Sequence, residues 1–151
     1  MRKDVYLLLM ALSLFLACKS TVQNVDLKKP IDAQILSLKN NDKSDSLKLD
    51  LCSFIPIKWD SLVVVTGYAL PKSLEAFNFE NHYVLGQLIG YSGMPENSIL
   101  LLYIQGKRIV GYSELPSPQL HYLLVSKHYM SGFTVIYESE CDNLWLRKEG
   151  L

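Results

Sequence analysis

The apolar run at residues 99–104 is the feature that most restricts the fold. These six residues are followed by the turn sequence Gln105-Gly106-Lys107-Arg108 and then by a second apolar pair, Ile109-Val110. Gly106 stands at the first central position of a two-residue loop, where a type II′ turn needs a positive φ. The segment therefore predicts a β-hairpin. Because an isolated hairpin is only marginally stable in water, we expect it to be part of a larger sheet.

Other strands are predicted from their hydrophobic patterns. Residues 47–52 alternate apolar and polar side chains, as do residues 133–138, which is typical of strands with one buried face. Residues 62–65 are Leu-Val-Val-Val, apolar on both faces, and this favours an interior strand. Residues 144–146 are expected to add a short edge strand.

Two short helices are expected between the strands. Pro71 can begin one that carries Leu74 and Phe77 on one side, and Ser117-Pro118 can begin a second near residues 118–124, where a strand is the alternative. Residues 79–97 show no clear period. The order of elements predicts an α+β fold with a small antiparallel sheet and one or two short helices packed on one face.

The N-terminal residues 1–17 indicate an exported protein. Arg2 and Lys3 precede an apolar run at residues 5–16, and Ala17 closes it, which is typical of a secretory signal peptide. The run is short for a helix that must cross about 30 Å of hydrocarbon.

Residues 14–18, Leu-Phe-Leu-Ala-Cys, resemble the lipobox of bacterial lipoproteins. The resemblance implies that Cys18 is the site of lipid attachment, including palmitate, and becomes the mature N-terminus. Lys19 stands where the family's sorting rule places Asp for retention in the inner membrane, which implies an outer-membrane protein that faces the periplasm. An ordinary signal peptide that happens to end at a cysteine, or an uncleaved anchor, is the alternative.

The rest of the chain is expected to have two parts. Residues 18–46 contain no aromatic side chain and many Lys, Asp, Asn and Ser, so we expect a lipidated N-terminus and a flexible tether. Within them, Ile31, Ile35 and Leu38 have helix-like spacing, and a short amphipathic helix is an alternative there. Residues 47–151 are expected to form a single α+β domain.

A second resemblance covers residues 47–138. Trp59-Asp60, the strand at 62–65, Tyr68 and Pro71, followed by the hairpin at Gly106, are similar to small uncharacterised bacterial lipoproteins with a Trp-Asp, strand, Pro-Tyr core. Gly67 stands where that pattern usually has Pro. The resemblance implies no activity, and we expect Trp59 to be a packed aromatic and Asp60 a turn-forming carboxylate.

Lipidation of Cys18 would leave two cysteines, Cys52 and Cys141. They could form a disulfide in an oxidising periplasm if the segments 47–52 and 133–141 pair in one sheet. Two buried free thiols are the alternative. No CxxC spacing occurs in the chain.

No constellation in the sequence predicts catalysis, a metal site or a cofactor. His121 and His128 are too far apart along a helix to share one ion, and His82 stands alone. Gly90-Tyr91-Ser92-Gly93 lacks the fifth residue of a nucleophile elbow. No spacing among the carboxylates of Glu75, Glu80, Glu96, Glu114, Glu138 and Glu140 identifies an acid and base pair.

Charge and aromatic content favour a binding role. Without residues 1–17 the chain keeps 13 basic and 14 acidic residues, so its net charge is close to zero and would not attract nucleic acid. Its eight tyrosines could form either a recognition surface or the rim of a small core: Tyr68, Tyr83, Tyr91, Tyr103, Tyr112, Tyr122, Tyr129 and Tyr137. We expect a membrane-anchored, non-catalytic binding module for an envelope protein or glycan. A cell-envelope hydrolase and a structural envelope subunit are the alternatives.

Overall fold

The computed structural model describes residues 22–41, 46–49, 51–66, 71–90, 98–116, 129–130 and 133–147. Three predictions therefore lie outside the described residues: the signal peptide at 1–17, the lipid attachment site Cys18, and the helix at 118–124. Among the residues that are described, no helix has the length and apolar content needed to cross a membrane.

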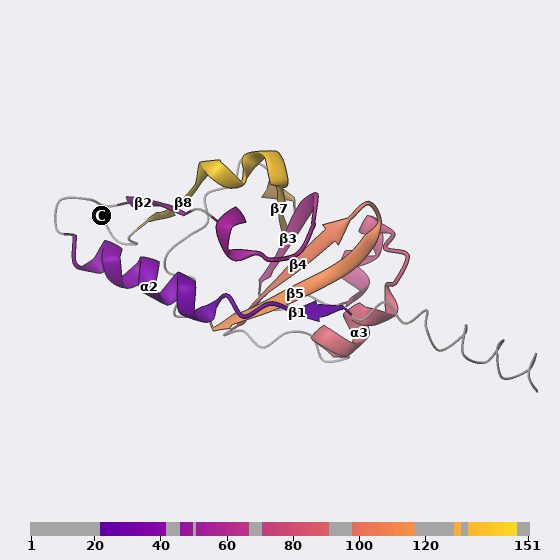
Figure 1. The fold of residues 1–151 in the computed structure, drawn as a ribbon. Coiled ribbons are helices and arrows are strands. Elements are labelled where there is room, and N and C mark those ends of the chain that lie inside the picture. Colours follow the sequence, from indigo (N-terminus) through magenta and orange to yellow (C-terminus); the bar gives the residue numbers. More distant parts are fainter. Residues whose placement is uncertain are drawn as a thin grey trace, which may run out of the picture.

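The main sheet has six strands in the order β1-β5-β4-β3-β7-β6 (Figure 1). β1 pairs parallel to β5, and every other neighbouring pair is antiparallel. A short edge strand is thus added in parallel to an otherwise antiparallel sheet. The strands are β1 (Gln23–Asn24), β3 (Ser61–Thr66), β4 (Ser98–Gln105), β5 (Arg108–Pro116), β6 (Tyr129–Met130) and β7 (Phe133–Tyr137).

The hairpin predicted at residues 99–110 is confirmed as β4–β5. Gln105 pairs with Arg108, and Gly106 between them has a φ of 61°. Because Lys107 does not share the positive φ, the loop has the signature of a type II′ turn. The apolar segment at 62–65 is confirmed as an interior strand, since β3 lies between β4 and β7.

Both faces of the sheet are covered. On one face Leu62 and Val64 lie in a core cluster with helix α2 (Lys28–Lys39). On the other face Val63 and Val65 cluster with the 3₁₀ helix η2 (Pro71–Phe77) and helix α3 (Tyr83–Ile89). The α+β class with a small sheet and short helices is confirmed. The helices pack on both faces of the sheet and not on one as predicted, because β3 and β4 have apolar side chains on both of their faces.

The prediction that residues 18–46 form a flexible tether is wrong for residues 22–41. α2 buries Ile31, Ile35 and Leu38 against the sheet, and Val25 and Leu27 are buried just before it. These are the helix-spaced residues that the sequence offered as an alternative, and their burial outweighs the polar composition of the segment. The folded domain therefore begins at β1 and not at residue 47.

A second, two-stranded sheet joins β2 (Ser46–Leu49) to β8 (Leu144–Arg147). The short edge strand at 144–146 is confirmed, but the expected pairing of residues 47–52 with 133–141 is wrong. β2 pairs with β8 instead. The 3₁₀ helix η1 (Cys52–Phe54) follows β2, and the 3₁₀ helix η4 (Glu138–Asn143) directly precedes β8.

Candidate functional site

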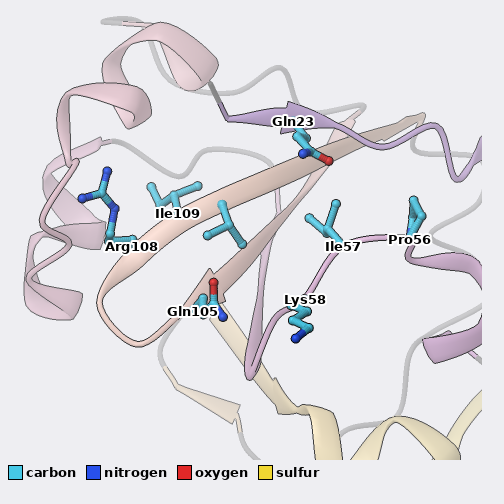
Figure 2. Close-up of a pocket in the computed structure, with 8 residues that line it drawn as sticks. Gln23, Pro56, Ile57, Lys58, Gln105, Arg108 and Ile109 are labelled. Atoms are coloured by element: carbon cyan, nitrogen blue, oxygen red, sulfur yellow. The ribbon is translucent and has the colours of Figure 1, made fainter. Parts of the chain in front are cut away.

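A pocket of about 370 Å³ lies where three segments meet at one end of the main sheet (Figure 2). β1 forms one wall, the segment just before β3 forms another, and the turn end of the β4–β5 hairpin forms the third. The lining residues are Gln23, Pro56, Ile57, Lys58, Gln105, Arg108, Ile109 and Val110.

Gly111 allows these walls to approach one another. It pairs with Gln23 across the β1–β5 ladder, and a Cβ at position 111 would lie 2.5 Å from Ile57 Cδ1 and 3.0 Å from the Gln23 carbonyl oxygen. A larger residue at position 111 would force the Ile57 side chain to turn away and would crowd the Gln23 carbonyl oxygen. The glycine in the interior of β5 therefore lets β1 and the segment before β3 pack closely beside the pocket.

A buried hydrogen-bond chain fixes β1 beside the pocket. Ser113 Oγ donates to the Val25 carbonyl oxygen at the end of β1, so the single hydroxyl proton of Ser113 is engaged. Tyr103 must then donate to Ser113 Oγ, at 2.6 Å. Burial raises the pKa of Tyr103 above its usual range, and the bond to Ser113 acts in the opposite direction. Tyr103 thus stays protonated and keeps the O–H group that donates to Ser113 Oγ.

Two cationic and two amide side chains line the pocket without converging on one point: Figure 2 draws the Arg108 guanidinium and the Lys58 ammonium pointing away from each other on opposite sides of it. Lys58 is exposed, and the Arg108 guanidinium lies 3.7 Å from the Glu80 carboxylate in an ion pair whose side chains are 48% and 56% exposed. Gln23 and Gln105 add neutral donors, and the lining residues include no carboxylate. An exposed ion pair of this kind contributes about 0 to 1 kcal/mol to stability.

The Trp-Asp motif positions the hairpin that carries this site. The prediction for it is confirmed: Trp59 is buried with its ring centroid 6.4 Å from that of Tyr103, and Asp60 Oδ2 accepts from the Gly106 N–H at 2.6 Å. The Asp60 backbone also bonds Ile104 and Glu138. Lys58 is therefore presented by a rigid stretch directly before β3.

Cys52 and Cys141 are joined by a disulfide in the structure, with their Cα atoms 5.8 Å apart. Both lie three residues beyond the last pair of the β2–β8 ladder, Leu49 with Leu144. The antiparallel register continues across η1 and η4 to bring the two cysteines opposite each other. Cys141 is buried and Cys52 is half-buried in the core on the α2 side.

The other residues that the sequence singled out do not gather into a site in the described part of the chain. His82 is exposed beside a second pocket of about 330 Å³ under η2, and His121 and His128 lie outside the described residues. Within the described ranges no three His, Cys, Asp or Glu residues come together as a metal site would require. Glu75, Glu80, Glu114 and Glu138 are exposed and Glu140 is half-buried, whereas Glu96 and Ser92 are not described.

The tyrosines are divided between the core and the surface. Tyr103 is fully buried, Tyr112 is half-buried against the α3-side core, and Tyr83 and Tyr137 are exposed. The side chains of Tyr68, Tyr91, Tyr122 and Tyr129 lie outside the description. Tyr103 thus belongs to the core and Tyr112 to its edge, whereas a recognition surface of tyrosines stays a prediction.

Sequence reasoning missed the pocket. The sequence predicts only a turn at Lys107 and Arg108, and nothing local links residue 23 to residues 108–111. Gly111, in the interior of β5, was the available signal for a close approach of another segment. Comparison of the chain with protein-family models, with curated proteins and with solved structures gives no match.

Proposed function

We propose that this protein is a cell-envelope lipoprotein, anchored by acyl chains on Cys18, whose α+β domain is a non-catalytic binding module. The proposed location is the outer membrane, with the domain facing the periplasm. The domain binds an envelope component through the pocket at Gln23, Lys58 and Arg108.

The distribution of the three cysteines is the observation that carries the proposal. Cys52 and Cys141 are bonded to each other, so Cys18 is the cysteine left over. It stands directly after the apolar N-terminal run and Ala17. A disulfide between distant segments is typical of an oxidising compartment, and acyl chains on the remaining cysteine at ~0.8 kcal/mol per buried CH₂ would make release from the bilayer negligible.

The pocket supports a binding role. Its lining combines two cations, two amides and four apolar side chains, and a mixture of apolar and polar groups is typical of ligand pockets. The side chains that line the pocket can donate hydrogen bonds or make apolar contacts. The buried hydroxyls of Tyr103 and Ser113 already hydrogen-bond, and these bonds hold β1 in place.

Metabolic labelling with a fatty acid tests the anchor. We expect the wild-type chain to incorporate label and Cys18→Ala to incorporate none and to remain unprocessed or soluble. The matched control is the double variant with Cys52→Ala and Cys141→Ala, which should label as the wild type does. Equal labelling of Cys18→Ala and the wild type would refute the lipoprotein assignment.

A further inference from the structure

We infer that the Cys52–Cys141 disulfide is a site of thiol–disulfide exchange, entered at the Cys52 sulfur, and that its reduction opens the two-stranded β2–β8 sheet. The co-substrate is a dithiol, the reactive group of disulfide reductases and isomerases. The resting form is the disulfide that the structure contains. The inference goes beyond the binding function proposed above and depends on neither the acyl anchor nor the pocket.

The two sulfur atoms of the bond differ in access. Cys141 is 4% exposed and belongs to the core cluster on the α2 side, whereas Cys52 is only partly buried and packs against that cluster. An attacking thiolate must reach the sulfur atom, so the more accessible cysteine is the point of entry. Reduction also gives Cys52 a thiol proton, and its Sγ lies 3.9 Å from the Glu138 carbonyl oxygen, which can accept that proton in a hydrogen bond.

The exchange takes two balanced steps. One thiolate of the dithiol attacks Cys52 Sγ, the Sγ–Sγ bond breaks, and Cys141 leaves as a thiolate that takes up a proton. The second thiol of the dithiol then attacks the first sulfur of the same dithiol, and Cys52 leaves as a thiolate that is protonated in turn. The protein gains two electrons and two protons, and the dithiol becomes a disulfide.

The second sheet is the element that most needs the bond. β2 and β8 are joined by four residue pairs, and a two-stranded sheet of this size is marginally stable in water. The disulfide closes one end of this ladder, three residues beyond its last pair. The next ladder pair toward the main sheet is Ser61 with Tyr137, nine positions after Cys52 and four before Cys141. Without the bond, the ladder would be closed only through this longer loop.

The packing around the bond confines the opening to β2 and β8. Leu51 and Ile55, on either side of η1, are buried in the core cluster, so η1 stays attached to the main sheet. β2 lies beside α2 (Figure 1), and its Leu47 is only partly buried against the same cluster. Release of β2 would therefore uncover apolar surface on the α2 side while the main sheet stays folded.

The point of entry is tested by trapping the mixed disulfide. The oxidised full-length Cys18→Ala chain, which has no third thiol, is treated briefly in detergent solution with reduced glutathione. The reaction is quenched with acid, free thiols are alkylated with N-ethylmaleimide, and the peptides are mapped by mass spectrometry. We expect glutathione on Cys52 and the maleimide on Cys141 in nearly all singly modified chains. Equal amounts of the two possible products, or the reverse pattern, would refute entry at Cys52.

The opening is tested by amide hydrogen exchange of the same chain before and after reduction with dithiothreitol. We expect the amides of β2 and β8 to exchange on the order of 100-fold faster after reduction, which is the size of the effect for a bond that closes a loop of about 15 residues. The amides of the interior strands β3 and β4 should keep their protection. With Cys52→Ala and Cys141→Ala added, the chain should exchange like the reduced one and should not respond to dithiothreitol.

Three outcomes would overturn the inference. Unchanged exchange in β2 and β8 after complete reduction would show that the second sheet does not depend on the bond. Loss of protection in β3 and β4 as well would show that the bond holds the whole domain and not one sheet. A response of the variant without Cys52 and Cys141 to dithiothreitol would show that the reductant acts elsewhere. None of these results affects the labelling of Cys18, so the proposed function stands or fails separately.

Discussion

Asn81 stabilises the hairpin end that carries the pocket, and its removal is the sharpest test of the fold. Its side-chain amide donates to the Ile109 carbonyl oxygen and its own oxygen accepts from the Ile109 N–H, both at 2.9 Å. Asn81 is 3% exposed, and Ile109 is buried. The side chain thus imitates a neighbouring strand at one residue of β5.

The variant Asn81→Ala would leave two backbone groups of Ile109 buried without a partner. Each such group costs about 1 to 3 kcal/mol, so we expect the free energy of unfolding to fall by about 2 to 6 kcal/mol. Equilibrium urea unfolding of the oxidised protein, followed by far-ultraviolet circular dichroism, measures this change. Asn24→Ala, at an exposed side chain on β1, is the matched control and should change the free energy by no more than about 0.5 kcal/mol.

A loss below about 1 kcal/mol for Asn81→Ala would refute this reasoning, since neither backbone group of Ile109 could then depend on the amide. The backbone of Glu80 bonds the Lys107 carbonyl oxygen next to this site, and the variant leaves that bond in place. The predicted loss therefore reports the Asn81 side chain and not the general attachment of the turn.

Three further changes test other parts of the structure. Replacing Cys52 and Cys141 together by Ala, at a separation of 89 residues, should lower the free energy of unfolding by about 4 to 5 kcal/mol; two freely alkylatable thiols in the exported wild-type protein would contradict the bond. Gly111→Ala should cost about 1 to 3 kcal/mol by overpacking the pocket wall, and an unchanged melting temperature would disprove the close approach. Ile35→Ala should lower the free energy of unfolding by about 2 to 5 kcal/mol, whereas Leu36→Ala, at a side chain 59% exposed, should change it little. Equal effects of the two substitutions would show that α2 does not pack on the sheet.

The strands were predictable because their local pattern and their final environment agree. Residues 62–65 are apolar on both faces, and β3 is covered on both faces. The turn at Gly106 requires a positive φ, and the same residue has one. In these segments, propensity, periodicity and turn chemistry all indicate one structure.

The elements that were mispredicted or missed depend on contacts between distant parts of the chain. α2 presents a stripe of only three buried residues in a polar segment, and β1 has two residues with no strand pattern of their own. α3 lies in a region where glycine interrupts the hydrophobic period. Composition gives too little weight to such short segments, because their stability comes from packing on the sheet and not from their own propensity.

The pocket could not be predicted for the same reason. Gln23 reaches it only through parallel pairing with Gly111, and Lys58 only through the bonds that Asp60 makes with the hairpin turn. The disulfide shows the intermediate case. Its two residues were identified by counting cysteines, but the expected strand pairing was wrong, since the β2–β8 ladder continues into two 3₁₀ helices before the cysteines meet.

The packing of residues 22–41 changes where a protein anchored at Cys18 can act. A flexible tether over residues 18–46 would have given the domain a typical reach of about 30 Å from the bilayer, from the random-coil scaling of 5 to 6 Å times the square root of the residue number. Val22 follows Cys18 by four positions, which allows at most about 14 Å between their Cα atoms. Since β1 and α2 belong to the core, that distance cannot grow without unfolding them. With the proposed anchor on Cys18, the start of the domain would therefore be held close to its own membrane surface.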